Sequence, residues 1–273
     1  MSTQIYTIPP SKELERIAKS FFVMEHTESD LQEKYLLPDG LPSFFHLSVS
    51  EDIHAHFLEV EEKFVMKSGL YVGYANTLMK FTHKEMKIIG VSVFPIYMSI
   101  LLGSSLSELM NKFIPVGTVI KNNMELDILQ NASPSDPEEL IQLIERFIIG
   151  RIRQNPVKEE ILDIYKLIIK SKGNEIRLDD LTNKTGYSAR HINNLFQKHL
   201  GMAPKQLIKL ARFNYGLKLI GELNKDKNLT QIAIELGYYD QAHFIKDFKS
   251  VCGKTPGELL AEKDDFHKNF NLY

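Results

Sequence analysis

The sequence predicts a two-domain α+β protein, with an antiparallel β-barrel and helices in residues 1–155 and an all-α domain in residues 156–264. Three observations lead to this prediction. Short β-rich runs fill residues 21–93, an internal helical repeat fills residues 178–259, and the two halves of the chain differ in charge. A chain of 273 residues has room for two domains of ordinary size.

The β-rich half consists of short runs of Val, Ile, Phe and Tyr, separated by turn sequences such as Pro38-Asp39-Gly40 and Ser68-Gly69. Short strands at this density are typical of a small antiparallel barrel or sandwich. The predicted strands are residues 21–24, 34–37, 43–50, 54–58, 64–67, 70–74 and 86–93. One short helix is predicted before them, at 14–21, and two after them, at Ile96–Leu102 and Ser105–Lys112.

A longer helix is predicted to start at residues 135–139, where a capping residue, a proline and two acidic residues follow one another. Its apolar side chains form an arc wider than one buried face requires. The helix is therefore either packed on two sides within its own domain or meets a second copy of the chain, forming a homodimer through residues 137–153. The sequence RQNP at 153–156 is expected to be the hinge to the second domain.

The internal repeat has the spacing of two helix-turn-helix units, at residues 178–201 and 229–253. In each unit a helix with one apolar face ends at a glycine, which accepts the left-handed conformation needed at a helix C-terminus. A polar residue then caps a second helix. This arrangement is typical of proteins that place the second helix in the major groove of DNA. The turn glycines are Gly186 and Gly237, and the caps are Ser188 and Asp240.

The second unit carries a long gapped motif, L-x-x-I-A-x-x-x-G-Y-x-D-x-x-x-F-x-K-x-F-K-x-x-x-G-x-x-P, at residues 229–256. With the first unit, it resembles the AraC/XylS transcription regulators over residues 156–260. Arg212 also fits a pattern on that family's connecting helix, whereas Gly216 stands where alanine is usual. The resemblance implies a cupin-like N-terminal barrel that responds to an unknown small-molecule effector or a partner, and contact with RNA polymerase.

The charge distribution agrees with a DNA-binding C-terminal domain. The whole chain has a net charge of −2, but residues 1–155 carry −6 and residues 156–273 carry +4. The stretch from Lys184 to Lys254 carries +7. A basic segment over the repeat is the electrostatic feature expected of a phosphate-binding face, although a charged run is also found on ordinary solvated surfaces.

The outward faces of the second helices carry the residue types that read base edges in double-stranded DNA. Arginine pairs with guanine and asparagine with adenine. The alternative is a solvated polar face without a ligand. The second unit is expected to contribute position more than discrimination, because Ile245 forms no hydrogen bonds. The predicted base-reading residues are Arg190, Asn193, Asn194, Gln241 and Ile245, and the predicted phosphate contacts are Gln197, Lys198, Arg212, Lys246 and Lys249.

A metal site is the main competing interpretation of the N-terminal half. His54, His56 and Glu61 have the H-x-H-x4-E spacing of the first cupin metal motif, and both histidines would lie on one face of a strand. The flanking glycines and a second motif element are missing, so neither metal nor cofactor is expected. The single cysteine, Cys252, excludes a disulfide framework and is expected in the core.

No signal peptide is visible, and the longest apolar stretch, Ile88–Gly103, is shorter than the ~20 residues that span a bilayer. The expected location is therefore cytoplasmic, without a membrane. The sequence as a whole predicts a sequence-specific DNA-binding transcription regulator, an effector- or partner-controlled activator rather than an enzyme. The alternatives are a cupin-type metal enzyme with a DNA-binding tail and a regulator that needs no ligand.

Overall fold

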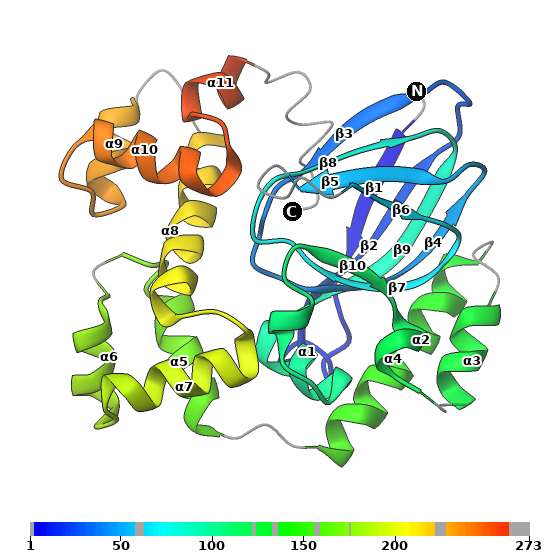
Figure 1. Ribbon diagram of the computed structural model, residues 1–273, viewed down its shortest axis with the longest axis horizontal. Helices are drawn as coiled ribbons and strands as arrows, with labels where there is room; N and C mark the ends of the chain where they lie inside the picture. Colours follow the sequence, from blue (N-terminus) through cyan, green and yellow to red (C-terminus); the bar gives the residue numbers. More distant parts are fainter. Residues whose placement is uncertain are drawn as a thin grey trace.

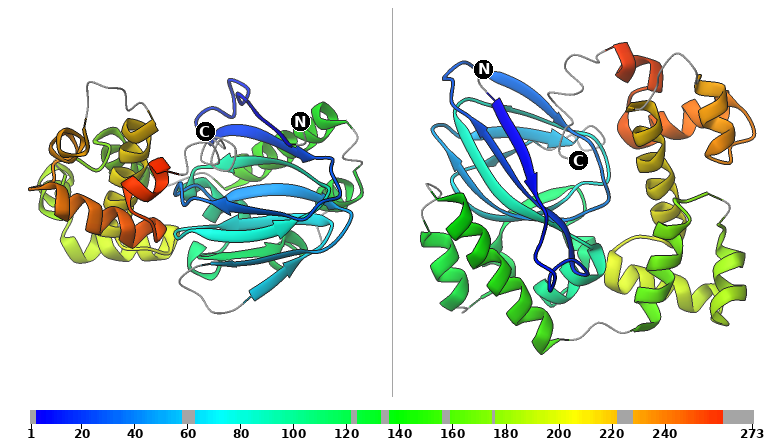
Figure 2. Two further views of the ribbon diagram at one scale, coloured as in Figure 1. Left: turned by 90° about the horizontal axis from the view of Figure 1, so that it is seen from above. Right: turned by 180° about the vertical axis from the view of Figure 1, so that it is seen from behind.

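The computed structural model describes residues 3–57, 63–121, 124–132, 136–155, 159–174, 176–221 and 228–261. An antiparallel β domain with associated helices comes first, and a domain made only of helices follows it (Figure 1). The two domains lie side by side, as the perpendicular and rear views in Figure 2 also show. The predicted α+β order of domains is confirmed.

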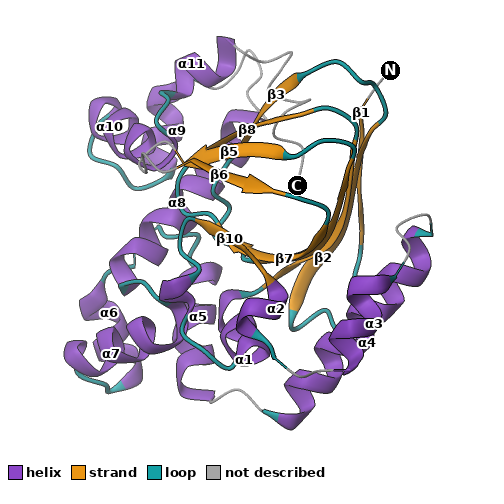
Figure 3. Cartoon of the chain, turned by 45° about the vertical axis from the view of Figure 1, so that its right-hand side comes forward, coloured by secondary structure: helices purple, strands orange, loops and turns teal. Residues whose placement is uncertain are grey.

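Two antiparallel sheets make up the β domain (Figure 3). The described strands are β1 Thr3–Ile8, β2 Ala18–His26, β3 Gln32–Leu36, β4 Ser43–Val49, β5 Ile53–Phe57, β6 Lys63–Met66, β7 Gly69–Tyr74, β8 Met79–His83, β9 Met86–Val93 and β10 Lys112–Pro115. The larger sheet has the order β1-β2-β9-β4-β7-β10, and the smaller has the order β3-β8-β5-β6. Neighbouring strands within each sheet are antiparallel, as the short-strand pattern predicts.

Strand β2 of the larger sheet is buried on both faces, and this strand replaces part of a predicted helix. Phe21 and Val23 of β2 belong to the cluster on the helix side of the sheet, whereas Phe22 and Met24 belong to the cluster between the sheets. Because β2 already begins at Ala18, which pairs with Val93 of β9, the helix predicted at 14–21 does not form. Residues 12–17 form turns instead, and β2 follows them.

The prediction of a helix at Ser105–Lys112 is also wrong. Only a single 3-10 turn, η1 Leu106–Glu108, forms there, and Ser105 caps it. Asn111 adopts a left-handed conformation, with φ 51°, and its backbone N–H donates to the carbonyl of Tyr74 at 2.7 Å. The chain is thereby directed into β10, which extends the sheet beside β7.

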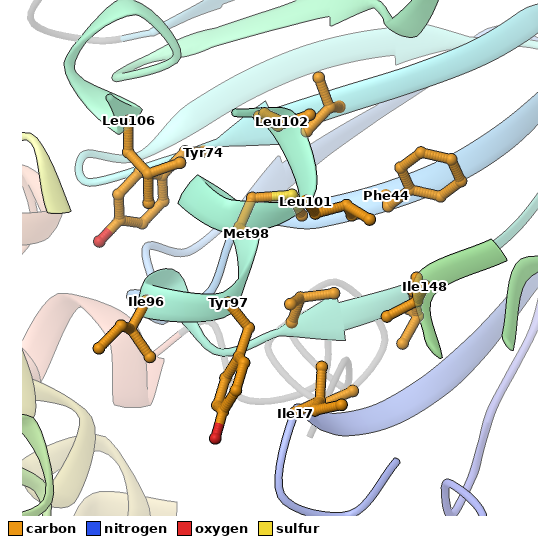
Figure 4. Packing of buried hydrophobic residues seen from close by; sticks show 14 of the residues in the cluster. Ile17, Phe44, Tyr74, Ile96, Tyr97, Met98, Leu101, Leu102, Leu106 and Ile148 are labelled. Atoms are coloured by element: carbon orange, nitrogen blue, oxygen red, sulfur yellow. The ribbon is translucent and has the colours of Figure 1, made fainter. Parts of the chain in front are cut away.

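Two helices cover the outer face of the larger sheet. They are α1 Pro95–Leu102, as predicted, and α4 Pro137–Gln154. Figure 4 shows Leu101 of α1 and Ile148 of α4 close to Phe44 of β4 in this cluster. The Phe44 ring also stacks on Phe147 at 5.4 Å between centroids. Two smaller helices complete the domain, α2 Val116–Val119 and α3 Met124–Asn131.

Helix α4 starts as predicted, because the Asp136 carboxylate accepts from the backbone N–H groups of Glu138 and Glu139 at 3.0 and 3.1 Å. The wide apolar arc of α4 is largely covered within the chain, by the sheet, α1 and α3. This is the first of the two arrangements that the sequence allowed. The buried members of the arc are Leu140, Ile141, Ile144, Phe147 and Ile148, and the partly buried ones are Leu143, Ile149 and Ile152.

The helical domain contains both predicted helix-turn-helix units. Its helices are α5 Glu159–Lys170, α6 Leu178–Thr185, α7 Ala189–Leu200, α8 Pro204–Gly221, α9 Leu229–Glu235, α10 Gln241–Cys252 and α11 Pro256–Ala261. The turn glycines Gly186 and Gly237 have φ values of 73° and 74°, the conformation for which glycine was expected. The two units lie at opposite ends of α8 (Figure 1). Among the described residues, no helix has the length and apolar character needed to cross a bilayer.

The two domains share apolar contacts and hydrogen bonds. One cluster of buried side chains continues from the β domain into α5, α7 and α8. The Ser105 hydroxyl donates to the carbonyl of Gln197 at 3.2 Å, and the side-chain amide of Asn214 donates to the carbonyl of Asp39 at 2.8 Å. The β domain therefore contacts the C-terminal end of α7 and the middle of α8.

Candidate nucleic-acid interface

Helix α7 of the first unit has one buried face and one exposed face. The Ser188 hydroxyl accepts from the backbone N–H of His191 at 3.2 Å, which fixes the start of the helix as predicted. The buried residues are Ile192, Leu195, Phe196 and Leu200. The exposed residues include Arg190, Asn194, Gln197 and Lys198. Four of the residues predicted to contact DNA are thus on the solvent side of one helix.

Asn193, the remaining candidate on α7, is half-buried. Its side-chain NH₂ donates to the carbonyl of Ala189, one turn earlier, at 2.8 Å. Reading adenine requires both the donor and the acceptor of an asparagine amide. Asn193 would therefore have to give up this bond to make a bidentate base contact, unlike the exposed Asn194.

Helix α10 of the second unit likewise has a capped start, one buried face and one exposed face. The Asp240 carboxylate accepts from the backbone N–H of His243 at 2.7 Å and caps the helix. Lys246 and Lys249, both predicted phosphate contacts, are exposed. The buried face consists of Phe244, Phe248, Val251 and Cys252.

The two predicted base-reading residues of α10 are less available than those of α7. The side-chain carbonyl of Gln241 accepts from the Thr230 hydroxyl at 2.6 Å, and this contact ties the start of α10 to α9. Ile245 is partly buried and packs against the apolar cluster of the second unit. Both side chains are thus engaged within the domain, unlike the exposed Arg190 and Asn194 of α7.

Arg212, also predicted to contact phosphate, is engaged within the helical domain. Its Nε donates to the carbonyl of Gly173 at 2.8 Å, and its guanidinium lies over the Tyr238 ring, 5.0 Å from the centroid. The side chain is half-buried in this position. Arg212 therefore joins the end of the first helical segment to the corner of the second unit, which is an internal structural role.

The sequence pattern did not identify Asp247 or Tyr239 as functional or structural residues. Asp247 accepts from the Tyr238 hydroxyl at 2.7 Å and lies 3.2 Å from Lys209 Nζ, so it fastens α10 to α8 and to the α9–α10 turn. Burial and the neighbouring Asp247 carboxylate raise the pKa of Tyr238, which keeps the hydroxyl protonated as a donor. Tyr239 is 93% exposed immediately before the cap of α10. The gapped motif specifies Tyr238 but leaves the positions of Tyr239 and Asp247 open, so it did not single out these two residues.

Cys252 is a core residue, as predicted. Its thiol is buried, and burial raises its pKa to about 11. The thiol therefore stays neutral at ordinary pH and lacks the thiolate character of reactive cysteines.

The histidines of the competing metal interpretation lie on β5. His54 is exposed and His56 is half-buried, whereas Glu61 lies outside the described residues. No group of three or more His, Cys, Asp or Glu side chains suited to a metal ion occurs in the described part of the chain.

A cavity of about 90 Å³ lies within the β domain. Its walls are mainly apolar, with Phe22, Phe45 and Phe81 among the aromatic side chains, and Lys34 and Asp39 among the few charged ones. Cavities of this kind accept small molecules whose body is apolar. The sequence predicted a sensor domain here without indicating which side chains would line the cavity.

Comparisons with known proteins agree with the geometry of the helical domain. A family described as a helix-turn-helix domain matches residues 181–262. The probable transcription factor PqrA of Proteus vulgaris is 30% identical over 84 residues, which are 31% of this chain and 67% of PqrA. The Msm operon regulatory protein of Streptococcus mutans is 25% identical over 125 residues, 45% of this chain and 44% of that protein. Several such relatives are therefore matched over less than half of their length.

Among solved structures, ToxT from Vibrio cholerae is similar over 96% of this chain and 98% of its own, with 13% identity and a TM-score of 0.49. A further ToxT structure, with a TM-score of 0.46, contains a bound unsaturated fatty acid.

Proposed function

Since the chain belongs to the AraC/XylS family of helix-turn-helix transcription regulators, we propose that it binds a specific double-stranded DNA site through both units and activates transcription there. One observation supports this most directly. Two capped helices, α7 and α10, present exposed polar and basic side chains at opposite ends of the rigid helix α8. Family membership also favours a regulator over an enzyme with a DNA-binding tail.

Base reading is assigned chiefly to the first unit. Arg190 and Asn194 are exposed on α7 and have the side chains that pair with guanine and adenine. Asn193, Gln241 and Ile245 remain secondary candidates, because each is already engaged within the domain. The proposed phosphate contacts are Gln197, Lys198, Lys246 and Lys249, without Arg212.

We assign the sensor function to residues 1–155 and DNA binding to residues 156–264. The apolar cavity of the sensor domain suits an effector with a hydrophobic body, and Lys34 suits an acidic group at one end of it. Because the β domain contacts α7 and α8, an effector that shifts this contact would bias DNA binding or the contact with RNA polymerase. The expected location of this activity is the cytoplasm.

We also propose a homodimer, but we place its contact surface on α3 rather than at residues 137–153. Since Ile148 is fully buried, its replacement by Glu would unfold the β domain rather than separate subunits. Met124 and Ile128 of α3, beside α4, are 79% and 52% exposed and offer the apolar contact instead. Met124→Glu is expected to shift a dimer to monomers in sedimentation at micromolar concentration. A protein that is monomeric without this change would remove the idea.

The test of the proposed function is genome-wide mapping of bound DNA, with and without candidate effectors. The unmodified chain is compared with a variant carrying Arg190→Ala and Asn194→Ala. The unmodified chain should occupy a small set of promoters that share a motif, and the variant should lose them while remaining folded. Equal occupancy by both proteins would contradict the assignment of the reading face. Occupancy that never responds to effectors would favour a regulator that needs no ligand.

A further inference from the structure

The turn of the second helix-turn-helix unit is one residue longer than the turn of the first. Between the turn glycine and the helix cap, the first unit has Tyr187 alone, whereas the second has Tyr238 and Tyr239. Tyr187 and Tyr238 occupy equivalent places, because each ring lies beside the third residue of the helix that follows. The ring centroids are 5.0 Å apart for Tyr187 and His191 and 5.2 Å apart for Tyr238 and His243. Tyr239 is therefore the additional residue.

The additional tyrosine lies outside the packing of the helical domain. Tyr239 is 93% exposed, whereas Tyr238 beside it is 7% exposed and donates its hydroxyl to Asp247. Among the described residues, the Tyr239 side chain has no hydrogen-bond partner and no aromatic contact. Exposure alone would not indicate a function, since single exposed apolar side chains are common on protein surfaces. The position of the side chain is more specific.

Tyr239 is the last residue before Asp240, the cap of α10. The second helix of a helix-turn-helix unit enters the major groove with its N-terminal residues against the base edges. A residue just before that end is therefore carried to the rim of the groove, where the sugar-phosphate backbone runs. Tyrosine is one of the side chains that bind phosphate oxygens in such complexes.

The start of α10 otherwise has few groups free to bind DNA. The Gln241 side chain accepts from Thr230, and Ile245 packs against the apolar cluster of the unit. The exposed lysines, Lys246 and Lys249, lie in later turns of the helix. No lysine or arginine occurs in the α9–α10 turn or in the first turn of α10. A phosphate at this end of the helix would thus meet the Tyr239 hydroxyl and no side chain of lysine or arginine.

We propose that Tyr239 anchors the second unit on DNA, its hydroxyl donating a hydrogen bond to a backbone phosphate at the rim of the groove that α10 enters. This inference rests on the proposed function and adds one residue to the same interface. A hydrogen bond from a hydroxyl to a phosphate oxygen is charge-assisted and stronger than one between neutral groups. Because the backbone is the same at every base pair, the contact adds affinity without selecting a sequence.

The test measures the affinity of the 273-residue chain for a mapped promoter site and for a random duplex of the same length. Tyr239→Phe removes only the hydroxyl and should weaken binding to both about tenfold, the effect of losing ~1.4 kcal/mol. Because tyrosine is uncharged, this variant should keep the salt dependence of the unmodified chain, whereas Lys249→Ala should reduce it. Tyr6→Phe is the matched control. Tyr6 is 44% exposed on β1, so its variant should bind both duplexes as tightly as the unmodified chain.

The absence of tryptophan from the chain allows a second readout. Tyr239→Trp introduces a single indole beside the cap of α10. Its fluorescence should change when either duplex is added, and the change should saturate with the affinity measured in the binding assay. Tyr6→Trp should show no change. Thermal unfolding checks that each variant is folded, and Tyr239 variants should unfold like the unmodified chain because the side chain is exposed.

Equal affinities of Tyr239→Phe and the unmodified chain for both duplexes would overturn the contact, and so would an indole at this position that does not respond to DNA. The proposed function would survive that result if Arg190→Ala and Asn194→Ala still weakened specific binding. Unchanged DNA affinity together with lost activation in transcription by purified RNA polymerase would place Tyr239 at a protein surface and would also overturn the contact. An unmodified chain that binds neither duplex would overturn the proposed function and this contact together.

Discussion

Arg190 and Arg212 are the same residue type in the same basic segment, but they lie in opposite environments. Arg190 is exposed on α7, whereas Arg212 contacts the Gly173 carbonyl and the Tyr238 ring inside the helical domain. The difference arises from the helix face on which each residue lies and from what packs against that face. A count of basic residues therefore predicts a DNA-binding domain without predicting which cations reach phosphate.

Arg190→Ala is expected to weaken binding to a specific site by about 1–3 kcal/mol, the usual value of a bidentate base contact. Binding to random DNA should change less. Lys249→Ala is the matched comparison, because a phosphate contact supports both kinds of binding and contributes to the salt dependence. Titrations at several salt concentrations measure both quantities. An unchanged ratio of specific to random affinity in Arg190→Ala would show that α7 is not the reading helix.

His83 is expected to make the stability of the β domain depend on pH. Burial lowers the pKa of this imidazole from 6.5 to about 4, although the Lys84 carbonyl, 2.6 Å from its Nδ1, acts in the opposite direction. Since the unfolded chain takes up a proton at higher pH, this stability is present above pH 6.5 and is lost as the pH falls to 4. The loss should reach about 3 kcal/mol.

The check is denaturant unfolding at pH values from 7.5 to 4, compared with His83→Phe, which cannot titrate. Phenylalanine preserves a ring beside Phe81, on which His83 stacks at 5.6 Å. The unmodified chain should lose stability relative to the variant over this range. Parallel curves for the two proteins would show that His83 does not carry the effect.

At the scale of whole elements, structures that depend on a few neighbouring residues were predicted better than structures that depend on a distant part of the chain. The helix-turn-helix units were predicted from glycines and caps that act within a few residues, and Gly186, Gly237, Ser188 and Asp240 are used as expected. Strands β1, β8 and β10 were missed. Each of them is defined by pairing with a distant strand, such as β10 with β7, and no local pattern contains that partner.

The contacts between the two domains could not be predicted from the sequence either. Asn214 on α8 donates to Asp39, and Ser105 donates to Gln197, but nothing in the composition of either segment indicates the other. The exposed candidates on α7 were predictable from helical periodicity alone. The internal contacts of Asn193, Gln241 and Arg212 were not, because they depend on which neighbours the fold brings within reach.

Gly216, in the interior of α8, can be replaced by alanine to test how tightly the helix packs. A methyl group added at Gly216 would lie 3.1 Å from Cδ1 of Leu236, the flexible end of a side chain, so a small shift accommodates it. Alanine also favours the helix by up to ~1 kcal/mol over glycine. Gly216→Ala should therefore leave the free energy of unfolding unchanged or slightly raised, and DNA affinity should not fall.

Gly173→Ala is the matched control, because the same methyl group would lie 2.3 Å from the Ile208 carbonyl at a residue with φ 68°. That variant should lose about 1–3 kcal/mol or more, through backbone strain that no side chain relieves. Denaturant unfolding of both variants makes the comparison. A larger loss in Gly216→Ala than in Gly173→Ala would mean that the packing of α8 on the second unit is tighter than its contacts indicate.

On the scale of the whole molecule, the face of α7 that carries Arg190 and Asn194, the proposed reading face, is exposed beside the β domain. Near the C-terminal end of α7, the Ser105 hydroxyl bonds to the Gln197 carbonyl; just beyond that end, the Tyr74 hydroxyl lies 3.9 Å from the Met202 sulfur. Arg190 is exposed at the start of α7, the opposite end of the helix from Gln197. We therefore expect the chain to bind DNA without separation of its two domains.

The spacing of the two units predicts the length of the site. Helix α8 has 18 residues, which at 1.5 Å per residue is about 27 Å. Successive major-groove faces on one side of DNA are about 34 Å apart, a distance that α8 and the widths of the attached units can span. One full-length chain should therefore protect about two helical turns of DNA. Within them, base changes should matter most under α7, because Arg190 and Asn194 are exposed there.

Hydroxyl-radical footprinting of the 273-residue chain on a mapped promoter measures the length of the protected site. The comparison is a variant that combines Lys246→Ala and Lys249→Ala. The combined variant should lose protection in the groove facing α10 and retain it in the other. Protection confined to a single groove by the unmodified chain would show that α10 does not dock, and the two-unit mode of binding would be wrong.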